Sequence, residues 1–282
     1  MSARGTAGEA VYDADRASDS NSLENLARIG LVAYGLVHLL VAWLALQLAW
    51  GGGGGEADQS GAMATLAKSP VGKPLLWVIA IGLVALAVWQ AAEALHARGA
   101  VHGVGRQKKK AIQTIVKSVA RAVVYVVLAV TAFKFAIGSG KSSAQQQQKG
   151  TAGVFGWPGG RFLVAIAAIV LICVGANLVY QGVKKKFLKQ IDLAQAPPKT
   201  TRVITRLGQA GFPAKGVALA LVGGLLGYAA ITFDPSKASG LDGAMRTILS
   251  APFGEVLLTL VAVGIVAFGA FLFARARYPE RT

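Results

Sequence analysis

The sequence is poor in the residues that most often form catalytic and metal-binding sites. Its 282 residues include one cysteine and three histidines. A single cysteine excludes an internal disulfide, and Cys173, which lies in an apolar run, is expected to be a small buried apolar residue. His96 and His102 lie in a basic stretch without the carboxylates or thiolates that a zinc site requires. Neither a serine–histidine–acid set nor paired carboxylates occur at usable spacing, so the sequence predicts no enzymatic activity, no metal and no cofactor.

Charge is also scarce, and this excludes an ordinary soluble domain. Charged residues make up 15% of the chain, against about 25% in soluble proteins, whereas 54% are hydrophobic and the mean hydropathy is +0.53. A helix needs about 20 mostly apolar residues to cross a bilayer. Six runs approach this length, at residues 29–50, 75–95, 119–137, 162–180, 217–233 and 256–274. The sequence therefore predicts an all-α fold, a polytopic membrane bundle of six transmembrane helices.

A short sequence motif occurs twice, and a third time in altered form. Gly-Ala-Met-x-Thr-[Leu/Ile] begins at Gly61 and at Gly243, and Pro-x-Gly-x-x-Leu-Leu follows it at Pro70 and at Pro252. The middle copy keeps Pro-x-Gly, but from Lys149 it reads Lys-Gly-Thr-Ala where the others read Gly-Ala-Met-x. The signature positions are Gly61, Met63, Pro70, Gly72, Pro158, Gly160, Gly243, Met245, Pro252 and Gly254. An apolar run precedes and follows each copy, which is the pattern of a repeat architecture.

The motif divides the chain into three repeats of two helices each. Residues 23–98, 99–184 and 185–282 are expected to form repeats 1, 2 and 3. They follow a polar, partly acidic tail at residues 1–22, whose composition predicts disorder. Because each repeat crosses the membrane twice, all three enter it in the same direction. A pseudo-threefold bundle of parallel repeats about the membrane normal is therefore expected.

Within each repeat the signature predicts local structure. Met63 and Met245 each share a helical face with apolar neighbours, so a short amphipathic helical turn on the outer rim of the bundle is expected between the two spans. Pro70, Pro158 and Pro252 should lie at or just before helix starts, where a missing N–H costs nothing. Glycines within the spans are expected where helix backbones approach closely. They are the small-xxx-small pair Gly223 and Gly227, together with Gly30, Gly35, Gly82, Gly216 and Gly264.

The formal net charge of +16 is concentrated in alternate connections. The basic residues are Arg98, Arg106, Lys108, Lys109, Lys110 and Lys117 after the second span, Lys184, Lys185, Lys186, Lys189, Lys199, Arg202 and Arg206 after the fourth, and Arg275, Arg277 and Arg281 at the end. Short Lys- and Arg-rich loops stay in the cytoplasm. Both termini are therefore expected in the cytoplasm and the protein in a bacterial inner membrane.

The same distribution indicates the expected partners. Basic loops beside a membrane attract anionic lipid head groups. No aromatic interleaving or recognisable module accompanies them, which argues against nucleic acid. The expected partners are thus the lipid bilayer, anionic head groups and other membrane proteins.

The repeated unit resembles a known family. Gly-Ala-Met-x-Thr-[Leu/Ile] followed by Pro-x-Gly-x-x-Leu-Leu is similar to the bacterial membrane family catalogued as domain of unknown function 1206, over essentially Leu26 to Arg277. The resemblance implies a six-helix inner-membrane protein. It implies no activity and no catalytic residues, because none is assigned to that family.

Few polar side chains fall within the spans, and such residues are functional candidates by default. The candidates are His38, Gln90, Glu93, Asn177 and Arg275, with Gln47 as a further polar group. His38 lies near mid-membrane, and its equivalents in the other repeats are Tyr125 and Leu219. A hydrogen-bonded packing histidine and a proton or ligand site both remain open, with packing favoured because no histidine cluster forms.

Glu93, Gln181 and Arg275 occupy one equivalent position near the cytoplasmic ends of the even-numbered spans. If that position faces the bundle axis, Glu93 meets Arg275 with Gln181 beside them. Alternatively, Glu93 pairs locally with Arg98 beyond the helix end, or extends to the head groups alone.

Three functions fit these observations. The leading interpretation is a non-catalytic scaffold or accessory subunit of an envelope complex, because intramembrane charge is scarce. The second is a small-solute or ion transporter or channel, and the third, least supported, is a membrane enzyme. The first two differ in one testable respect, namely whether the polar groups converge on one cavity.

Overall fold

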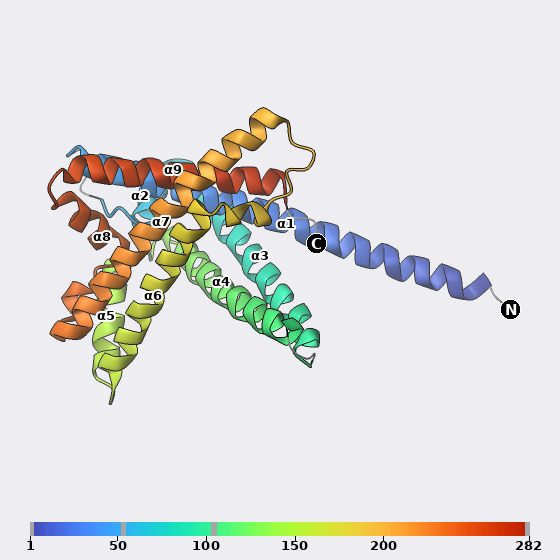
Figure 1. The fold of residues 1–282 in the computed structure, drawn as a ribbon, viewed down its shortest axis with the longest axis horizontal. Helices are drawn as coiled ribbons and strands as arrows, with labels where there is room; N and C mark the ends of the chain where they lie inside the picture. The colour runs from blue at the N-terminus through green and yellow to red at the C-terminus, as the bar shows by residue number, and fades with distance from the viewer. Residues whose placement is uncertain (1–2, 52–54, 103–105, 280–282) are drawn as a thin grey trace.

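The computed structural model describes residues 3–51, 55–102 and 106–279 (Figure 1). Within this part the regular structure is helical, apart from one isolated bridge between Ile191 and Pro279. Six helices are long and apolar enough to cross a membrane. They are α1 (Ala3–Ala49), α3 (Gly72–Arg98), α4 (Arg106–Ala136), α6 (Gly160–Val183), α7 (Pro198–Thr232) and α9 (Gly254–Arg277). The predicted all-α membrane bundle is confirmed.

Shorter helices occupy the connections. The loop of each repeat holds one α-helix, as the signature predicts: α2 (Gln59–Ala67), α5 (Ser143–Phe155) and α8 (Gly240–Leu249). Three 3₁₀ turns complete the described chain, η1 (Gly99–His102), η2 (Lys186–Gln190) and η3 (Pro235–Lys237). We call the end of the bundle with η1, η2 and the end of α9 the basic end, and the end with α2, α5 and α8 the signature end.

Two helices are longer than the hydropathy predicts. α7 begins at Pro198, not near residue 217, and continues through Pro213 and Lys215. α1 begins at Ala3, so residues 3–22, where disorder was expected, continue the first helix; residues 1 and 2 lie outside the described part. That stretch contains no proline and several alanines, which favour helix. Hydropathy marks only the part of a helix that can lie in hydrocarbon.

The six long helices associate mainly as three pairs, α1 with α9, α3 with α4, and α6 with α7. Figure 1 shows the α3–α4 hairpin running to the lower right and the start of α7 rising at the upper right, on either side of α1 and α9. Further packing joins α1 to α3 and α7 to α9, so both helices of repeat 1 and both helices of repeat 3 touch. Between α4 and α6 the described residues form no comparable packing. The expected threefold arrangement is therefore broken in repeat 2.

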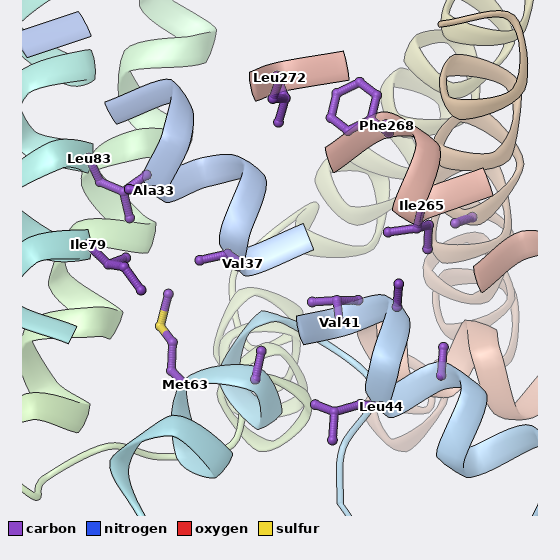
Figure 2. Packing of buried hydrophobic residues seen from close by; sticks show 14 of the residues in the cluster. Ala33, Val37, Val41, Leu44, Met63, Ile79, Leu83, Ile265, Phe268 and Leu272 are labelled. Atoms are coloured by element: carbon purple, nitrogen blue, oxygen red, sulfur yellow. The ribbon is translucent and has the colours of Figure 1, made fainter. Parts of the chain in front are cut away.

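The main core lies around α1. Figure 2 shows Val37 and Val41 of α1 between residues of α3 on one side and α9 on the other, with Met63 of α2 directed toward Ile79. Met63 and its equivalent Met245 are 1% and 0% exposed. At this position repeat 2 has Thr151. The short helices of repeats 1 and 3 are thus sealed against the spans by a buried methionine.

The Pro-x-Gly part of the signature has a steric explanation. Gly72, Gly160 and Gly254 are the first residues of α3, α6 and α9. A Cβ atom at any of them would overlap the backbone carbonyl of the preceding short helix, as at Leu66 for Gly72. Only glycine permits this approach. The motif therefore holds each short helix against the span that follows it.

Candidate functional site

A cavity of 1610 Å³ lies at the basic end of the bundle. Its walls come from α1, α3, α4 and α6, from the segment that follows α6, and from the end of α9. α4 contributes Thr114, Lys117, Ala120 and Arg121. These recur at helical spacing, so one face of α4 lines the cavity over about two turns.

Four of the five intramembrane polar residues singled out in the sequence line this cavity. They are Gln90 and Glu93 from α3, Asn177 from α6 and Arg275 from α9. The fifth, His38, lies elsewhere in the bundle, and Gln47 does not line the cavity either. The fold thus collects polar groups from three helices that lie far apart in the sequence.

The lining is strongly basic. Two acidic residues, Glu93 and Asp192, stand against seven basic ones: Arg28, Lys117, Arg121, Lys186, Lys189, Arg275 and Arg277. These side chains come from α1, α4, α9 and the segment after α6. A concave surface lined by charge of one sign concentrates ions of the other sign. The cavity is therefore built to attract an anion.

Gln90 adds a buried polar group without a partner. Its side chain is 5% exposed, and its Oε1 atom makes no hydrogen bond to the described residues. Buried side-chain amides normally have their hydrogen bonds satisfied. A bound molecule with a hydroxyl or amine donor would supply the missing hydrogen bond to the Gln90 Oε1 atom.

The shared position of Glu93, Gln181 and Arg275 faces the cavity in all three repeats. This is the inward orientation that one of the alternatives required. Direct pairing of Glu93 with Arg275 remains a prediction.

A second polar cluster lies deeper in the bundle, around Lys215 of α7. The Lys215 Nζ atom donates a hydrogen bond to the Tyr34 hydroxyl over 2.9 Å and lies 3.2 Å from His38 Nε2. It also lies 4.1 Å from the centre of the Phe268 ring. Hydroxyl, imidazole and ring faces thus replace a carboxylate as partners of this amine among the described residues.

His38 has partners on both ring nitrogens. Its Nδ1 lies 2.8 Å from the Tyr34 backbone oxygen, which only accepts, so Nδ1 carries the proton. Nε2 is then free to accept from Lys215. The ring is 5% exposed and packs edge-on against the Tyr34 ring at 4.4 Å.

Sequence reasoning missed Lys215 because it precedes the apolar run at residues 217–233 by two positions. The repeat register contains the signal that would have found it. Tyr34, Arg121 and Lys215 occupy one equivalent position, four residues before His38, Tyr125 and Leu219. Arg121 lines the cavity, and the Tyr34 and Tyr125 rings meet edge to face at 5.4 Å. The contact between Tyr34 and Tyr125 therefore connects the Lys215 cluster to α4, the helix that carries Arg121.

The remaining candidates have simple surroundings. Cys173 is exposed on α6, so the prediction that it is buried was wrong; it lies on an apolar helix surface that packing does not cover. The His96 Nδ1 atom donates a hydrogen bond to the Ala92 carbonyl over 2.8 Å, and the side chain of His102 lies outside the described residues. Among the residues that the structure describes, no cluster of three His, Cys, Asp or Glu side chains fits a metal ion.

A buried carboxylate organises the signature end. Asp58 caps α2, is 1% exposed, and accepts hydrogen bonds from the Gly61 amide and the Ser60 hydroxyl, each over 2.8 Å. Its Oδ2 atom has no partner among the described residues. Burial raises the pKa of Asp58, the two hydrogen bonds oppose that shift, and the nearby carboxylates of Glu56 and Asp242 raise the pKa further.

Hydrogen bonds at this end join the loops of all three repeats. Asp242 of α8 accepts from the Ala57 amide over 2.8 Å, and the Ser60 hydroxyl accepts from the Ser143 amide over 2.9 Å. Hydrogen bonds thus connect repeats 1, 2 and 3 at the signature end, whereas the basic end contains the cavity.

Comparisons with known proteins agree with this architecture. The family model described as "Domain of Unknown Function (DUF1206)" matches residues 29–104, 116–185 and 210–279, one segment for each repeat. The uncharacterized protein YxxB of Bacillus subtilis (strain 168) is 28% identical over 260 residues, which is 92% of each chain. No solved structure matches. The chain therefore belongs to the DUF1206 family of membrane proteins, whose function is unknown.

Proposed function

We propose that this integral membrane protein binds an anionic solute in the cavity at its basic end, as a binding or transport protein and not as an enzyme. The observation that carries the proposal is the lining, in which basic residues outnumber acidic ones by seven to two. Arg121 and Lys117 project from one face of α4 and supply hydrogen-bond donors to an anion.

Convergence of the polar groups favours binding over a purely structural role. The two interpretations differed in whether these groups meet, and Gln90, Glu93, Asn177 and Arg275 share one cavity. A scaffold has no use for an open basic cavity or for a buried amide without a partner. Transport would in addition require a path from this cavity through the bundle to the signature end.

The proposal places the protein in a bacterial inner membrane, with its basic end facing the cytoplasm. The Lys and Arg bias of the connections supports this orientation. It is tested by single cysteines at Gln107, Gln145 and Ser236, all exposed, in a Cys173→Ser background. We expect a membrane-impermeant thiol reagent to label positions 145 and 236 in intact cells and position 107 only after lysis. The reverse pattern would invert the topology.

Anion binding is tested on the purified full chain with glycerol phosphate as a soluble probe. Isothermal titration should show binding that weakens as salt rises. Arg121→Gln should weaken it about tenfold, because a hydrogen bond to a charged group contributes about 1.5–3 kcal/mol. Lys73→Gln removes an exposed cation at the start of α3, at the signature end, and is the matched control. Equal losses in both variants, or no binding by the wild type, would contradict the proposal.

A scaffold remains the second candidate because α4 and α6 present uncovered apolar faces. Only 22% and 17% of their most apolar windows are buried, against 61% in α1. A partner helix seated there would be recovered in fixed stoichiometry by native purification in mild detergent. Such a partner, together with absent glycerol phosphate binding, would favour the scaffold.

A further inference from the structure

The gap between α4 and α6 has an identifiable cause in the repeat register. The matched family segments begin at residues 29, 116 and 210, which makes Gly30, Lys117 and Gly211 equivalent. Counting from the aligned prolines makes Gly82, Val170 and Gly264 equivalent. Repeats 1 and 3 thus have glycine at both positions, and repeat 2 has neither.

In repeats 1 and 3 these glycines are where the two spans touch. A Cβ atom at Gly82 would lie 3.2 Å from the Gly30 Cα atom, and one at Gly211 would lie 2.5 Å from the Phe268 amide nitrogen. A Cβ at Gly264 would overlap Ala214. Small residues permit this backbone approach between membrane helices. Lysine and valine at the same positions of repeat 2 forbid it.

The surfaces that would have met in repeat 2 line the cavity instead. Lys117, Ala120 and Val174 are cavity-lining residues. They are the equivalents of Gly30, Ala33 and Leu86, which pack together between α1 and α3 in repeat 1. The cavity therefore extends along the α4 and α6 surfaces that correspond to the packed contact of repeat 1, toward the side of the bundle between these helices.

That side of the bundle faces hydrocarbon. Beyond the cavity, α4 exposes Val123 and Val127, with 57% and 58% of each side chain accessible, and α6 exposes Ile166 and Val170, with 58% and 54%. A ligand that fills both regions needs an anionic head for the cavity and an apolar tail for the gap.

We propose that the cavity receives the head group of an anionic phospholipid whose acyl chains leave between α4 and α6. This deepens the proposed function by naming the class of anion. Basic pockets between transmembrane helices are suited to such head groups. The phosphate lies against Lys117 and Arg121, and a head-group hydroxyl donates to the unpartnered Oε1 atom of Gln90. Phosphatidylglycerol carries both groups.

The experiment uses the full chain in mild detergent with added phosphatidylglycerol or phosphatidylcholine, and native mass spectrometry to count retained lipid. We expect at least tenfold preferential retention of phosphatidylglycerol. Val170→Trp, on α6 and outside the cavity lining, fills the gap without changing a charge and should lower that retention at least fivefold. Ile169→Trp, on a different exposed face of α6, is the matched control and should leave it unchanged. Melting temperatures verify that both variants fold.

The soluble probe separates this proposal from the one on which it rests. Val170→Trp should leave the affinity for glycerol phosphate within twofold, whereas Arg121→Gln should weaken the binding of both ligands. Glycerol phosphate binding without lipid preference, or equal effects of the two tryptophans, would overturn the lipid proposal and leave anion binding intact. A dimer mass without retained lipid would mean that a second copy of the chain covers the gap, and this would also overturn the lipid proposal. If neither ligand binds, both proposals fail.

Discussion

Repeats 1 and 3 differ from repeat 2 in how their two spans meet. All three share the Pro-x-Gly helix start and a short helix at the signature end. Only repeats 1 and 3 pack their first span against their second, through Gly30 with Gly82 and through Gly211 with Phe268. The comparison shows that one topology serves two purposes, since two repeats close the bundle and the third leaves it open.

The signature end shows the same division. Met63 and Met245 are almost fully buried, whereas the middle copy has Thr151, which is smaller and polar. Repeats 1 and 3 therefore supply most of the apolar seal around α1. Four predictions test this comparison, from the largest expected effect to the smallest.

Replacing Met63 and Met245 together with Asp should lower the free energy of unfolding by at least about 4 kcal/mol, because each buried methionine contributes about 2–5 kcal/mol and a charge enters an apolar contact. Thermal melting in detergent measures this. Thr151→Asp, at the equivalent position, should cost less than half as much. An unchanged melting temperature for the double variant would show that these residues do not seal the bundle.

Exchanging the residues at the span contact should affect the repeats unequally. Gly82→Val introduces the valine that repeat 2 has at this position into the contact with Gly30. It should lower the free energy of unfolding by about 3 kcal/mol through overpacking. Val170→Gly makes the opposite change on an exposed face and should cost about 1 kcal/mol, the helix cost of glycine. Unfolding in mixed micelles compares the two. Equal losses of stability in the two variants would mean that the close approach of the two spans does not distinguish repeat 1 from repeat 2.

The position shared by Glu93, Gln181 and Arg275 offers a double-mutant cycle across the cavity. Glu93→Gln and Arg275→Gln should each destabilise the protein, and together they should cost less than their sum by about 0.5–1 kcal/mol. The parallel cycle with Gln181→Ala should show no coupling to Glu93. Strict additivity in the first cycle would mean that Glu93 and Arg275 do not interact.

Asp58 should make the signature end of repeat 1 sensitive to pH, since the equivalent residues are Gln146 and Gly240. Its pKa is raised from 3.8, so the folded protein binds this proton more tightly than the unfolded chain. The resulting stabilisation is complete below pH 3.8 and is lost as pH rises through the raised pKa. Relative to Asp58→Asn, which keeps the cap, the wild type should lose stability across that window.

Asp58→Ala provides the control for the cap itself. Relative to Asp58→Asn, it should cost about 1 kcal/mol at every pH, because neither residue titrates and the hydrogen bond to Gly61 is lost. Identical pH profiles for the wild type and Asp58→Asn would place the titration elsewhere.

The sequence by itself determined the membrane class, the six spans, the repeats and the short helices. These follow from local properties: the length of an apolar run, proline before a helix start, and a glycine that fits where a side chain cannot. It also identified Gly30, Gly35, Gly82, Gly216 and Gly264 as packing positions. A Cβ at each of them, and at Gly223, would meet a neighbouring helix at 3.2 Å or less, which confirms the prediction there. At Gly227 the nearest atom would be 3.6 Å away, which is an ordinary contact.

Only the tertiary structure decided what those elements build. Lys215 meets Tyr34 and His38 across about 180 residues of chain, a contact that no local pattern specifies. The cavity likewise depends on the spans of repeat 2, since α4 and α6 do not pack against each other in the described structure as the spans of repeats 1 and 3 do. Helix packing follows from the shapes of both partners at once, and only the fold brings those partners face to face.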